Sequence, residues 1–306
     1  MASPPDLVFL GNLLVDDIVL QDGTTLMGEP GGALLHAALA ARLWGARVGL
    51  VSVVGDDYPA TALGALADRG VDLAGVRPLG RPGGRTWLLY EATHRRAIHH
   101  LARPSHDDVS PLPDDVPGGF RGAGAFHLAP MPLGRQRLLA ARLADERFLS
   151  LDPYELVRDD NVAAWSEVLA GVDAFFPSRD EILVAGGGDD RLAERLSGGR
   201  LRLVALKAGA GGGRLVDLSS ASALDWTSRA DMVVDATGAG DAFAGGFLAG
   251  FVLHGDRRRA IEQGIVAASY AIADWGARAL LAATPADAAA RHAAWFTAPG
   301  WGGARS

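Results

Sequence analysis

The sequence predicts an α/β protein in which helices cover both faces of a mainly parallel sheet, with a small second β-sheet beside it. Short apolar runs alternate with alanine- and leucine-rich stretches along most of the chain. Because parallel strands need long crossover connections, usually helices, this alternation favours three α/β/α layers. Two pairs of short β-like runs interrupt the alternation and predict the small sheet. The 306 residues, 49% of them hydrophobic, are enough for a large core.

The strands of the main sheet are predicted where valine, leucine and phenylalanine form short apolar runs. In chain order these runs are Leu7–Gly11, Val48–Val54, Ala125–Leu128, Phe148–Asp152, Ala174–Phe176, Leu201–Leu206 and Arg214–Leu218. Helices are predicted between or after them, because alanine and leucine are strong helix formers. In chain order they cover Ala33–Trp44, Arg135–Asp145, Ala163–Ala170, Arg191–Ser197, Gly240–His254, Arg257–Ala273 and Pro285–Phe296. The last begins after Thr284, a good N-cap, and carries Asp287 in its first turn.

The small sheet is predicted from two hairpins. Ile18–Leu20 and Thr24–Met27 flank an Asp-Gly pair, a strong hairpin signal, and Arg85–Tyr90 and Ala97–Leu101 flank a polar turn. We expect the hairpins to pair and to form a lid over the core. The predicted division is a core of residues 1–15, 30–82 and 105–306 and a lid of residues 16–29 and 83–104. An exposed lid edge predicts pairing with a second copy as a homodimer, with a monomer as the alternative.

Charge and composition limit which kinds of partner and cofactor the protein can have. The net charge is −7 and no long basic run occurs, so we expect no nucleic-acid partner. The chain has no cysteine, which excludes disulfides and thiolate metal sites. The N-terminus lacks the basic region of a signal peptide, and the longest apolar run, Ala242–Leu253, is too short to span a bilayer. We therefore expect a cytoplasmic protein without a membrane partner.

The most informative stretch is Val233–Phe243. It combines a short apolar run, a turn of small residues, an acid and the start of a helix rich in small residues. Glycines before a helix leave backbone N–H groups exposed, and these attract phosphate. Asp241 suits a general base that takes a proton from a hydroxyl while those N–H groups hold the charge of a phosphoryl group. The stretch predicts phosphoryl transfer to an alcohol, with a glycine-rich turn and a capping aspartate as the structural alternative.

Within this stretch, the run Asp-Ala-Thr-Gly-Ala-Gly-Asp-Ala-Phe resembles the C-terminal signature of the ribokinase-like (PfkB) carbohydrate kinase family. Only its second residue differs from the usual threonine or proline. The resemblance implies that Asp241 is the catalytic base. It also implies that Gly238, Ala239 and Gly240 form an anion hole for the transferred phosphoryl group.

The acceptor side of the resemblance lies near the N-terminus. Asp16 matches the aspartate that binds the hydroxyls of the substrate, and the adjacent Asp17 is the alternative. Gly31 and Gly32 match two glycines that let the backbone approach the sugar closely. His36 stands where the family normally has asparagine, which puts the identity of the substrate in doubt rather than the reaction.

The resemblance also implies two cation sites. Glu181 matches a glutamate that organises Mg²⁺ through water, and Ser178 stands where the family has asparagine beside the ATP phosphates. A capping box, in which Ser178 and Glu181 cap a helix start, is the structural alternative and is compatible with that role. Asp235 and Thr237 match residues that help to hold a monovalent cation, which predicts K⁺ as a further cofactor.

Nucleotide contacts are implied farther along the chain. Lys207, Gly209 and Gly212 follow a predicted buried strand and match a turn that lies beside the nucleotide in the family, although a β-turn also explains the glycines. Gly276 matches a turn beside the adenine pocket. On the lid, Arg103 is a candidate for binding a substrate phosphate, with a solvated surface position as the alternative. The same two interpretations apply to Arg85 and Arg96, and Trp87 is expected to project from the lid beside them.

The resemblance extends over roughly residues 6–296. It implies an ATP- and Mg²⁺-dependent kinase that phosphorylates a hydroxyl of a small molecule, either a sugar or a related polyol. A nucleoside or inositol kinase of the same family, or a catalytically silent binding protein on this fold, remain alternatives. A dinucleotide-binding oxidoreductase is disfavoured, because Gly-x-Gly-x-x-Gly does not follow the first strand.

Overall fold

The computed structural model describes residues 3–91, 95–184, 195–196 and 198–296. Its strands are β1 (Leu7–Leu10), β2 (Leu14–Val19), β3 (Thr25–Gly31), β4 (Val48–Val54), β5 (Val71–Pro78), β6 (Arg85–Tyr90), β7 (Arg95–His99), β8 (Ala125–Leu128), β9 (Leu149–Leu151), β10 (Val157–Arg158), β11 (Ala174–Phe175), β12 (Ile182–Leu183), β13 (Leu203–Lys207), β14 (Gly213–Asp217) and β15 (Ser222–Trp226). Its α-helices are α1 (Ala33–Leu43), α2 (Ala60–Asp68), α3 (Leu133–Arg142), α4 (Val162–Leu169), α6 (Ala239–His254), α7 (Arg257–Ala271), α8 (Arg278–Ala282) and α9 (Pro285–Phe296).

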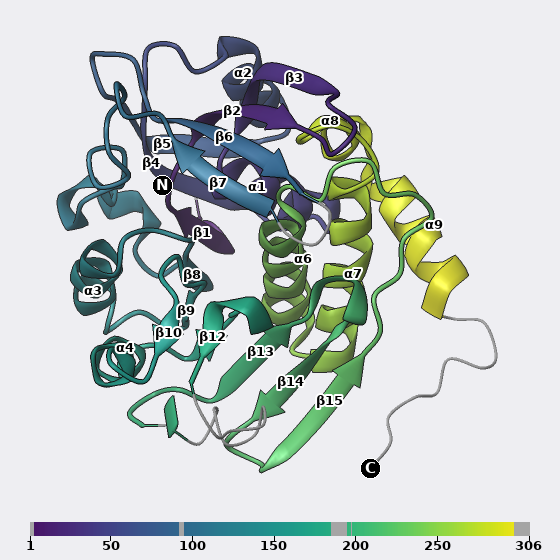
Figure 1. The fold of residues 1–306 in the computed structure, drawn as a ribbon. Helices are drawn as coiled ribbons and strands as arrows, with labels where there is room; N and C mark the ends of the chain where they lie inside the picture. The colour runs from purple at the N-terminus through teal and green to yellow at the C-terminus, as the bar shows by residue number, and fades with distance from the viewer. Residues whose placement is uncertain (1–2, 92–94, 185–194, 197, 297–306) are drawn as a thin grey trace.

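The described residues form one large sheet in the order β15-β14-β13-β11-β9-β8-β1-β4-β5. Its strands are parallel from β5 to β13, and β14 and β15 add an antiparallel edge. Helices cover both faces, with α1, α6 and α7 on one side and α3 and α4 on the other (Figure 1). The predicted three-layer α/β/α fold is therefore confirmed.

Strand β1 shows how the sequence builds the two cores. Successive side chains of a strand point to opposite faces. Leu7 and Phe9 accordingly join the core beneath α1, α6 and α7, whereas Val8 and Leu10 join the core beneath α3 and α4. Because both faces of this parallel sheet are covered, side chains on both faces of β1 are apolar, rather than those on one face alone.

The small sheet is also present. It has the order β3-β2-β6-β7, in which β2 and β3 form one hairpin and β6 and β7 form the other. Parallel pairing of β2 with β6 joins the hairpins, although they lie far apart in the sequence. In Figure 1 this sheet lies in the upper part of the view, whereas β13, β14 and β15 of the large sheet lie in the lower part. The division of the chain into core and lid remains a prediction.

The structure adds elements that the sequence patterns did not predict. These are α2, α8 and the strands β5, β10, β12 and β15, of which β15 lies at the edge of the large sheet. Strand β15 (Ser-Ala-Leu-Asp-Trp) mixes polar and apolar residues at the sheet edge, so it lacks a continuous apolar run. The predicted helix Arg191–Ser197 lies largely outside the described residues. Within the described ranges, no helix is both long and apolar enough to cross a bilayer.

His127 of β8 is a buried histidine whose protonation links the stability of the core to pH. Its imidazole is buried, and its Nδ1 lies 2.9 Å from the Ser150 hydroxyl oxygen. Burial, helped by the positive charge of Lys207, lowers the pKa of His127 to about 3. Below pH 6.5 the unfolded chain therefore takes up a proton that the folded protein does not, so stability falls as the pH falls.

Between pH 7.5 and 5.5, this one histidine is expected to remove about 1.4 kcal/mol from the free energy of unfolding. His127→Gln should be less stable at both pH values, but its loss over this interval should be smaller by about that amount. Urea denaturation of both proteins at the two pH values measures the difference. Equal losses in the two proteins would contradict a neutral buried His127.

Candidate active site

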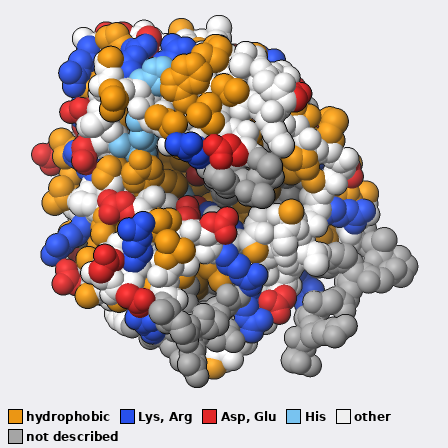
Figure 2. Space-filling view, in the orientation of Figure 1, with side chains coloured by type: hydrophobic (Ala, Val, Ile, Leu, Met, Phe, Trp, Pro, Cys, Tyr) orange, Lys and Arg blue, Asp and Glu red, His pale blue; other side chains and the backbone are white. Residues whose placement is uncertain are grey.

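The inner face of the small sheet lines a cavity of about 470 Å³. Thr86, Leu88 and Tyr90 of β6 all line it, at the alternate positions that share one face of a strand. Arg85 and Trp87 occupy the intervening positions and are not among the lining residues. Figure 2 shows histidine side chains gathered near the small sheet on this side of the molecule.

Strand register decides between the two adjacent aspartates. Asp16 is paired with Thr86 of β6, and Thr86 is in turn paired with His99 of β7, so the three side chains form one row across the sheet. All three line the cavity. Asp17 points away, and its carboxylate accepts two hydrogen bonds from the Arg85 guanidinium, each 2.7 Å long. Asp16 is thus the aspartate at the cavity.

Asp17 is a structural residue on the far face. Burial opposes its ionisation, but hydrogen bonds from Arg85 and from the Gly28 backbone N–H outweigh burial and leave the pKa of Asp17 lowered. Arg85 is therefore engaged away from the cavity. Trp87 stacks on His100, with ring centroids 5.3 Å apart, and Arg96 pairs with Glu91 at the surface. The structure brings none of these three predicted lid side chains to the cavity.

The glycine pair at the end of β3, Gly31 and Gly32, lies against the residues predicted to bind the acceptor. Gly32 has a φ of +92°, and a Cβ there would lie 2.3 Å from the Asn12 carbonyl oxygen. A Cβ on Gly31 would lie 1.8 Å from Oδ2 of Asp16. Any larger residue at either position would displace Asn12 or Asp16, which line the cavity, whereas the approach of this backbone to a sugar stays a prediction.

His36 lies between the acceptor side and the glycine-rich turn. Its side chain is buried, lines the cavity and has Nδ1 3.3 Å from the Gly32 carbonyl oxygen. A Cβ on Gly238 would lie 2.1 Å from the His36 ring. The histidine that replaces the family's asparagine therefore packs directly against the turn predicted to hold phosphate.

Three rings form a cluster on the cavity wall: His99 of the small sheet, His106, and Tyr154 after β9. The His106 and Tyr154 ring centroids lie 4.4 Å apart, and those of His99 and His106 lie 4.9 Å apart. His99 Nε2 lies 2.9 Å from the Tyr154 hydroxyl oxygen, and its Nδ1 lies 3.0 Å from Oγ1 of Thr86. We call these three residues the ring cluster.

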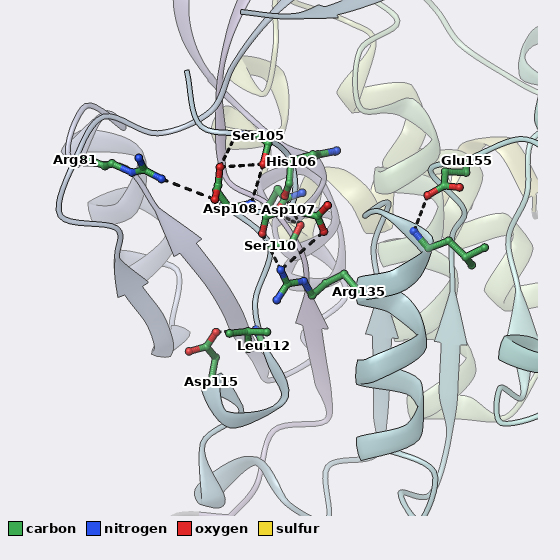
Figure 3. Close-up of polar contacts among 12 residues, drawn as sticks. Arg81, Ser105, His106, Asp107, Asp108, Ser110, Leu112, Asp115, Arg135 and Glu155 are labelled. Carbon is green, nitrogen blue, oxygen red and sulfur yellow. Dashed lines mark hydrogen bonds and ion pairs between the residues drawn. The ribbon is translucent and has the colours of Figure 1, made fainter. Parts of the chain in front are cut away.

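Burial keeps both histidines of the ring cluster neutral near pH 7. It lowers the pKa of His99 and, together with repulsion from His99, lowers the pKa of His106 to about 4. Polar contacts hold the loop that carries His106 (Figure 3). Asp108 accepts hydrogen bonds from the Ser105 backbone N–H and hydroxyl, each 2.9 Å long, and the Ser110 hydroxyl donates to the His106 carbonyl at 2.6 Å.

The predicted catalytic residues lie together at the start of α6. Gly238 is the N-cap, in a left-handed conformation with φ +72°, and Asp241 lies in the first turn. Gly238, Ala239, Gly240 and Asp241 all line the cavity. The amino end of this helix presents backbone N–H groups without intrahelical partners and the positive end of the helix dipole. This arrangement can hold an anion beside a carboxylate.

A buried ion pair faces this helix start. The Lys207 ammonium, at the end of β13, donates to the carboxylate of Asp152, which follows β9. A Cβ on Gly240 would lie 3.2 Å from Lys207 Nζ, so the ammonium lies against the glycine-rich turn. Burial would lower the pKa of Lys207, but attraction to nearby carboxylates, chiefly Asp152, leaves it raised. Lys207 therefore carries a positive charge.

Asp152 is a cavity residue that our sequence patterns missed. Burial raises its pKa to about 6 against the attraction of Lys207, and the negative charge of Asp241 adds to the rise. Its position was a usable signal, because it ends a predicted parallel strand and ligands bind at the carboxyl ends of such strands. Thr86, Tyr90 and the ring cluster were also missed, since their orientation depends on strand pairing.

Ser178 and Glu181 also line the cavity. They cap a one-turn 3₁₀ helix, in which the Ser178 backbone N–H donates to Oε2 of Glu181 at 2.7 Å. The capping box is therefore confirmed. It holds the Glu181 carboxylate at the same cavity as Lys207 and Asp241, while contact with Mg²⁺ remains a prediction.

A second cavity of about 370 Å³ meets the first at the glycine-rich turn. Lys207, Ala236, Ala239 and Gly240 line both. The second cavity is mostly apolar, which suits a nucleobase. Its other walls include Gly209, Gly212, Trp226, Phe243, Ile265 and Ile272. Gly212 has a φ of +87°, and a Cβ there would lie 2.0 Å from the Trp226 carbonyl oxygen, so the strand end requires glycine.

Two predicted contact residues lie elsewhere. The Arg103 guanidinium pairs with Asp57 at 2.9 Å, and Arg103 is not among the residues that line either cavity. Gly276 also lines neither cavity, and its backbone N–H donates to Oδ2 of Asp235 at 2.9 Å. Gly276 thus braces the segment before the helix start. The geometry lends no support to a phosphate contact by Arg103 or an adenine contact by Gly276.

Comparison with known proteins agrees with this geometry. Residues 145–284 match the model of the pfkB family carbohydrate kinases. A cytidine kinase from Thermococcus kodakarensis is 30% identical over 282 residues, which cover 89% of this chain and 97% of the relative. The chain belongs to the PfkB family. It is therefore an ATP-dependent kinase with an alcohol group as acceptor, as the sequence predicted.

Other PfkB relatives differ in acceptor. A fructokinase from Klebsiella pneumoniae is 31% identical over 267 residues, covering 80% of this chain and 84% of the relative. Among solved structures, a Burkholderia thailandensis nucleoside kinase in complex with inosine has a TM-score of 0.72 and 18% identity, covering 95% of this chain and 97% of that chain. An E. coli chain provisionally assigned to ribokinase II, in complex with ATP and Mg²⁺, has a TM-score of 0.73 and 21% identity, with coverages of 94% and 98%. These structures share the fold.

Proposed function

We propose that this PfkB kinase transfers the γ-phosphoryl group of ATP to a sugar hydroxyl of a nucleoside. The ring cluster is the observation that carries the choice of a nucleoside over a free sugar. It provides three planar side chains on the wall of the cavity that also contains Asp16. Aromatic faces bind nucleobases by stacking, and carboxylates such as Asp16 accept hydrogen bonds from sugar hydroxyls.

The arrangement of polar groups supports a nucleoside that binds with its sugar at Asp16 and its base at the ring cluster. Asp16, Thr86 and His99 form one row across the small sheet, so a ligand that binds Asp16 through its sugar lies alongside the ring cluster. His99 and His106 are neutral near pH 7, which allows each ring both to donate and to accept a hydrogen bond. The cytidine kinase relative, which is 30% identical to this chain over 97% of its own length, points to the same class of acceptor.

In the proposed mechanism, Asp16 and the backbone at Gly31 and Gly32 orient the sugar. Asp241 accepts the proton of the attacking hydroxyl as the hydroxyl oxygen bonds to the γ-phosphorus of ATP, while the bond from that phosphorus to the bridging oxygen breaks and ADP leaves. Backbone N–H groups at Gly238–Gly240 hold the charge on the transferred group. The lid excludes water from the cavity, which limits hydrolysis of ATP.

The second cavity suits the base of ATP, and the glycine-rich turn where the two cavities join suits its phosphates. The apolar walls around Phe243 and Ile265 suit the base, and Lys207 supplies positive charge where the cavities join. Mg²⁺ prefers carboxylate oxygens and keeps several waters, so Glu181 is the residue proposed to hold it through water. When bound, Mg²⁺ neutralises phosphate charge. The predicted K⁺ is not part of this proposal, because hydrogen-bond donors already engage Asp235.

An ADP-release assay over nucleosides, free sugars, polyols and inositols tests the acceptor. We expect kcat/KM for the best nucleoside to exceed that for ribose or fructose by at least about tenfold, the equivalent of one stacked base. Tyr154→Leu should raise the KM for that nucleoside by about tenfold, whereas Tyr154→Phe, which keeps the ring, should change it by less than about threefold.

The alternatives give different results in the same assay. Preference for a free sugar, unaffected by Tyr154→Leu, would contradict the nucleoside proposal and leave a carbohydrate kinase. Ligand binding without turnover would indicate the catalytically silent alternative. The cytoplasmic location, the lack of nucleic-acid and membrane partners and the lid-mediated homodimer stay predictions from the sequence.

A further inference from the structure

We propose that the Tyr90 hydroxyl takes the place of a monovalent cation beside the anion-binding turn, so that this kinase works without K⁺. Asp235 and Thr237 occupy the positions that the family resemblance assigns to such a cation. Tyr90 comes from the end of β6 in the small sheet, far from them in the sequence. Its role in turnover rests on the proposed function, but its effect on cation binding does not.

The contacts of Asp235 are all hydrogen bonds. The Tyr90 hydroxyl donates to Oδ1 of Asp235 at 2.7 Å, and the Thr237 backbone N–H donates to the same oxygen at 2.9 Å. The Gly276 backbone N–H donates to Oδ2 at 2.9 Å. Asp235 is 1% exposed. Three donors from three segments of the chain therefore stabilise this buried carboxylate without a positive charge.

The geometry is that of a hydrogen-bonded group rather than of cation ligands. Tyr90 Oη lies 2.7 Å from Oγ1 of Thr237 as well as from Oδ1 of Asp235. This is the usual O–H···O distance, at which a proton lies between each pair of oxygens. Oxygens that share protons in this way cannot all direct lone pairs at one ion between them. The donor set at Asp235 and Thr237 thus does not fit a bound K⁺.

The same contacts give Tyr90 a positioning role. Asp235 and Thr237 immediately precede Gly238, the N-cap of α6, and Thr237 is 6% exposed. Strand alternation directs Tyr90 into the cavity together with Thr86 and Leu88, so the inner face of the small sheet ends on the anion-binding turn. The Tyr90 hydroxyl therefore joins the small sheet to the residues that precede this turn.

The test compares K⁺ with N-methylglucamine at equal ionic strength, with Mg²⁺ present throughout. We expect kcat of the unmodified protein to agree within about twofold in the two salts. Tyr90→Phe leaves a buried acceptor without its donor, so its kcat in N-methylglucamine should fall about tenfold, with the acceptor KM changed less, and K⁺ should restore at least half of that loss. Tyr270→Phe, a matched change on α7 outside both cavities, should behave like the unmodified protein.

Thermal unfolding without substrates gives a second, independent measurement. A cation that binds the folded state raises Tm. We expect K⁺ to raise the Tm of Tyr90→Phe but not that of the unmodified protein. Activation of the unmodified protein by K⁺ of more than about fivefold, or full activity of Tyr90→Phe without K⁺, would overturn the proposal. If no acceptor is phosphorylated, the proposed function fails, and the Tm comparison still decides whether Tyr90 replaces the cation.

Discussion

Asp241→Asn is expected to lower kcat by about 10²–10⁴-fold, the usual contribution of a positioned general base. Asparagine keeps the shape of the side chain but cannot accept the hydroxyl proton. The anion-binding turn and the apolar cavity around Phe243 are untouched, so the Kd for ATP should change little. Stopped-flow or single-turnover measurements of ADP formation, with ATP affinity from calorimetry, separate the two quantities.

Asp256→Asn is the matched control for this change. Asp256 is the N-cap of α7, where its side chain accepts a hydrogen bond from the Arg259 backbone N–H. Asparagine also caps helices well, so both stability and turnover should be close to those of the unmodified protein. Near-normal kcat in Asp241→Asn would refute its assignment as the base, whereas loss of ATP binding would indicate that the carboxylate mainly shapes the turn.

Lys207→Met is expected to affect stability and turnover together. The Asp152 carboxylate is 2% exposed and would lose its cationic partner, which typically costs about 3–5 kcal/mol of the free energy of unfolding. Removing the positive charge from the point where the cavities meet should lower kcat/KM by about 10²-fold, as for loss of one preorganised electrostatic group. Urea denaturation and ADP-release kinetics measure the two effects.

A double variant separates these effects. Adding Asp152→Asn to Lys207→Met removes the unpaired carboxylate, and replacing a buried ion pair as a whole is often close to neutral. The double variant should therefore recover at least half of the lost stability while its kcat/KM stays low. If turnover recovered together with stability, Lys207 would act only by stabilising the fold and would have no direct part in phosphoryl transfer.

Much of the active site could be predicted because its chemistry is local. The run Asp235–Asp241 forms its own turn and helix start, and Gly31 and Gly32 permit a close backbone approach because they lack a Cβ. Ser178 and Glu181 cap one turn within four consecutive residues. Interactions of this kind act between near neighbours, so the order and spacing of residue types are enough to indicate them.

The contacts of the lid could not be predicted in the same way. The sequence patterns selected Arg85, Trp87 and Arg96, yet the cavity receives Thr86, Tyr90 and His99 instead. A shift of one residue in strand pairing exchanges the two faces of a strand. The pairing of β2 with β6 joins segments about 70 residues apart, and nothing local in either segment sets it.

The amino-acid sequence by itself determined the α/β/α fold and the family, and it predicted the glycine-rich turn before Asp241 as the place of phosphoryl transfer. These depend on hydrophobic periodicity and on residues close together in the chain. Only the tertiary structure decided that Asp16 rather than Asp17 faces the cavity, that Asp152 pairs with Lys207, and that Tyr90 contacts Asp235. Each of these follows from strand register and from packing between distant segments, because such contacts form only when the whole chain is folded.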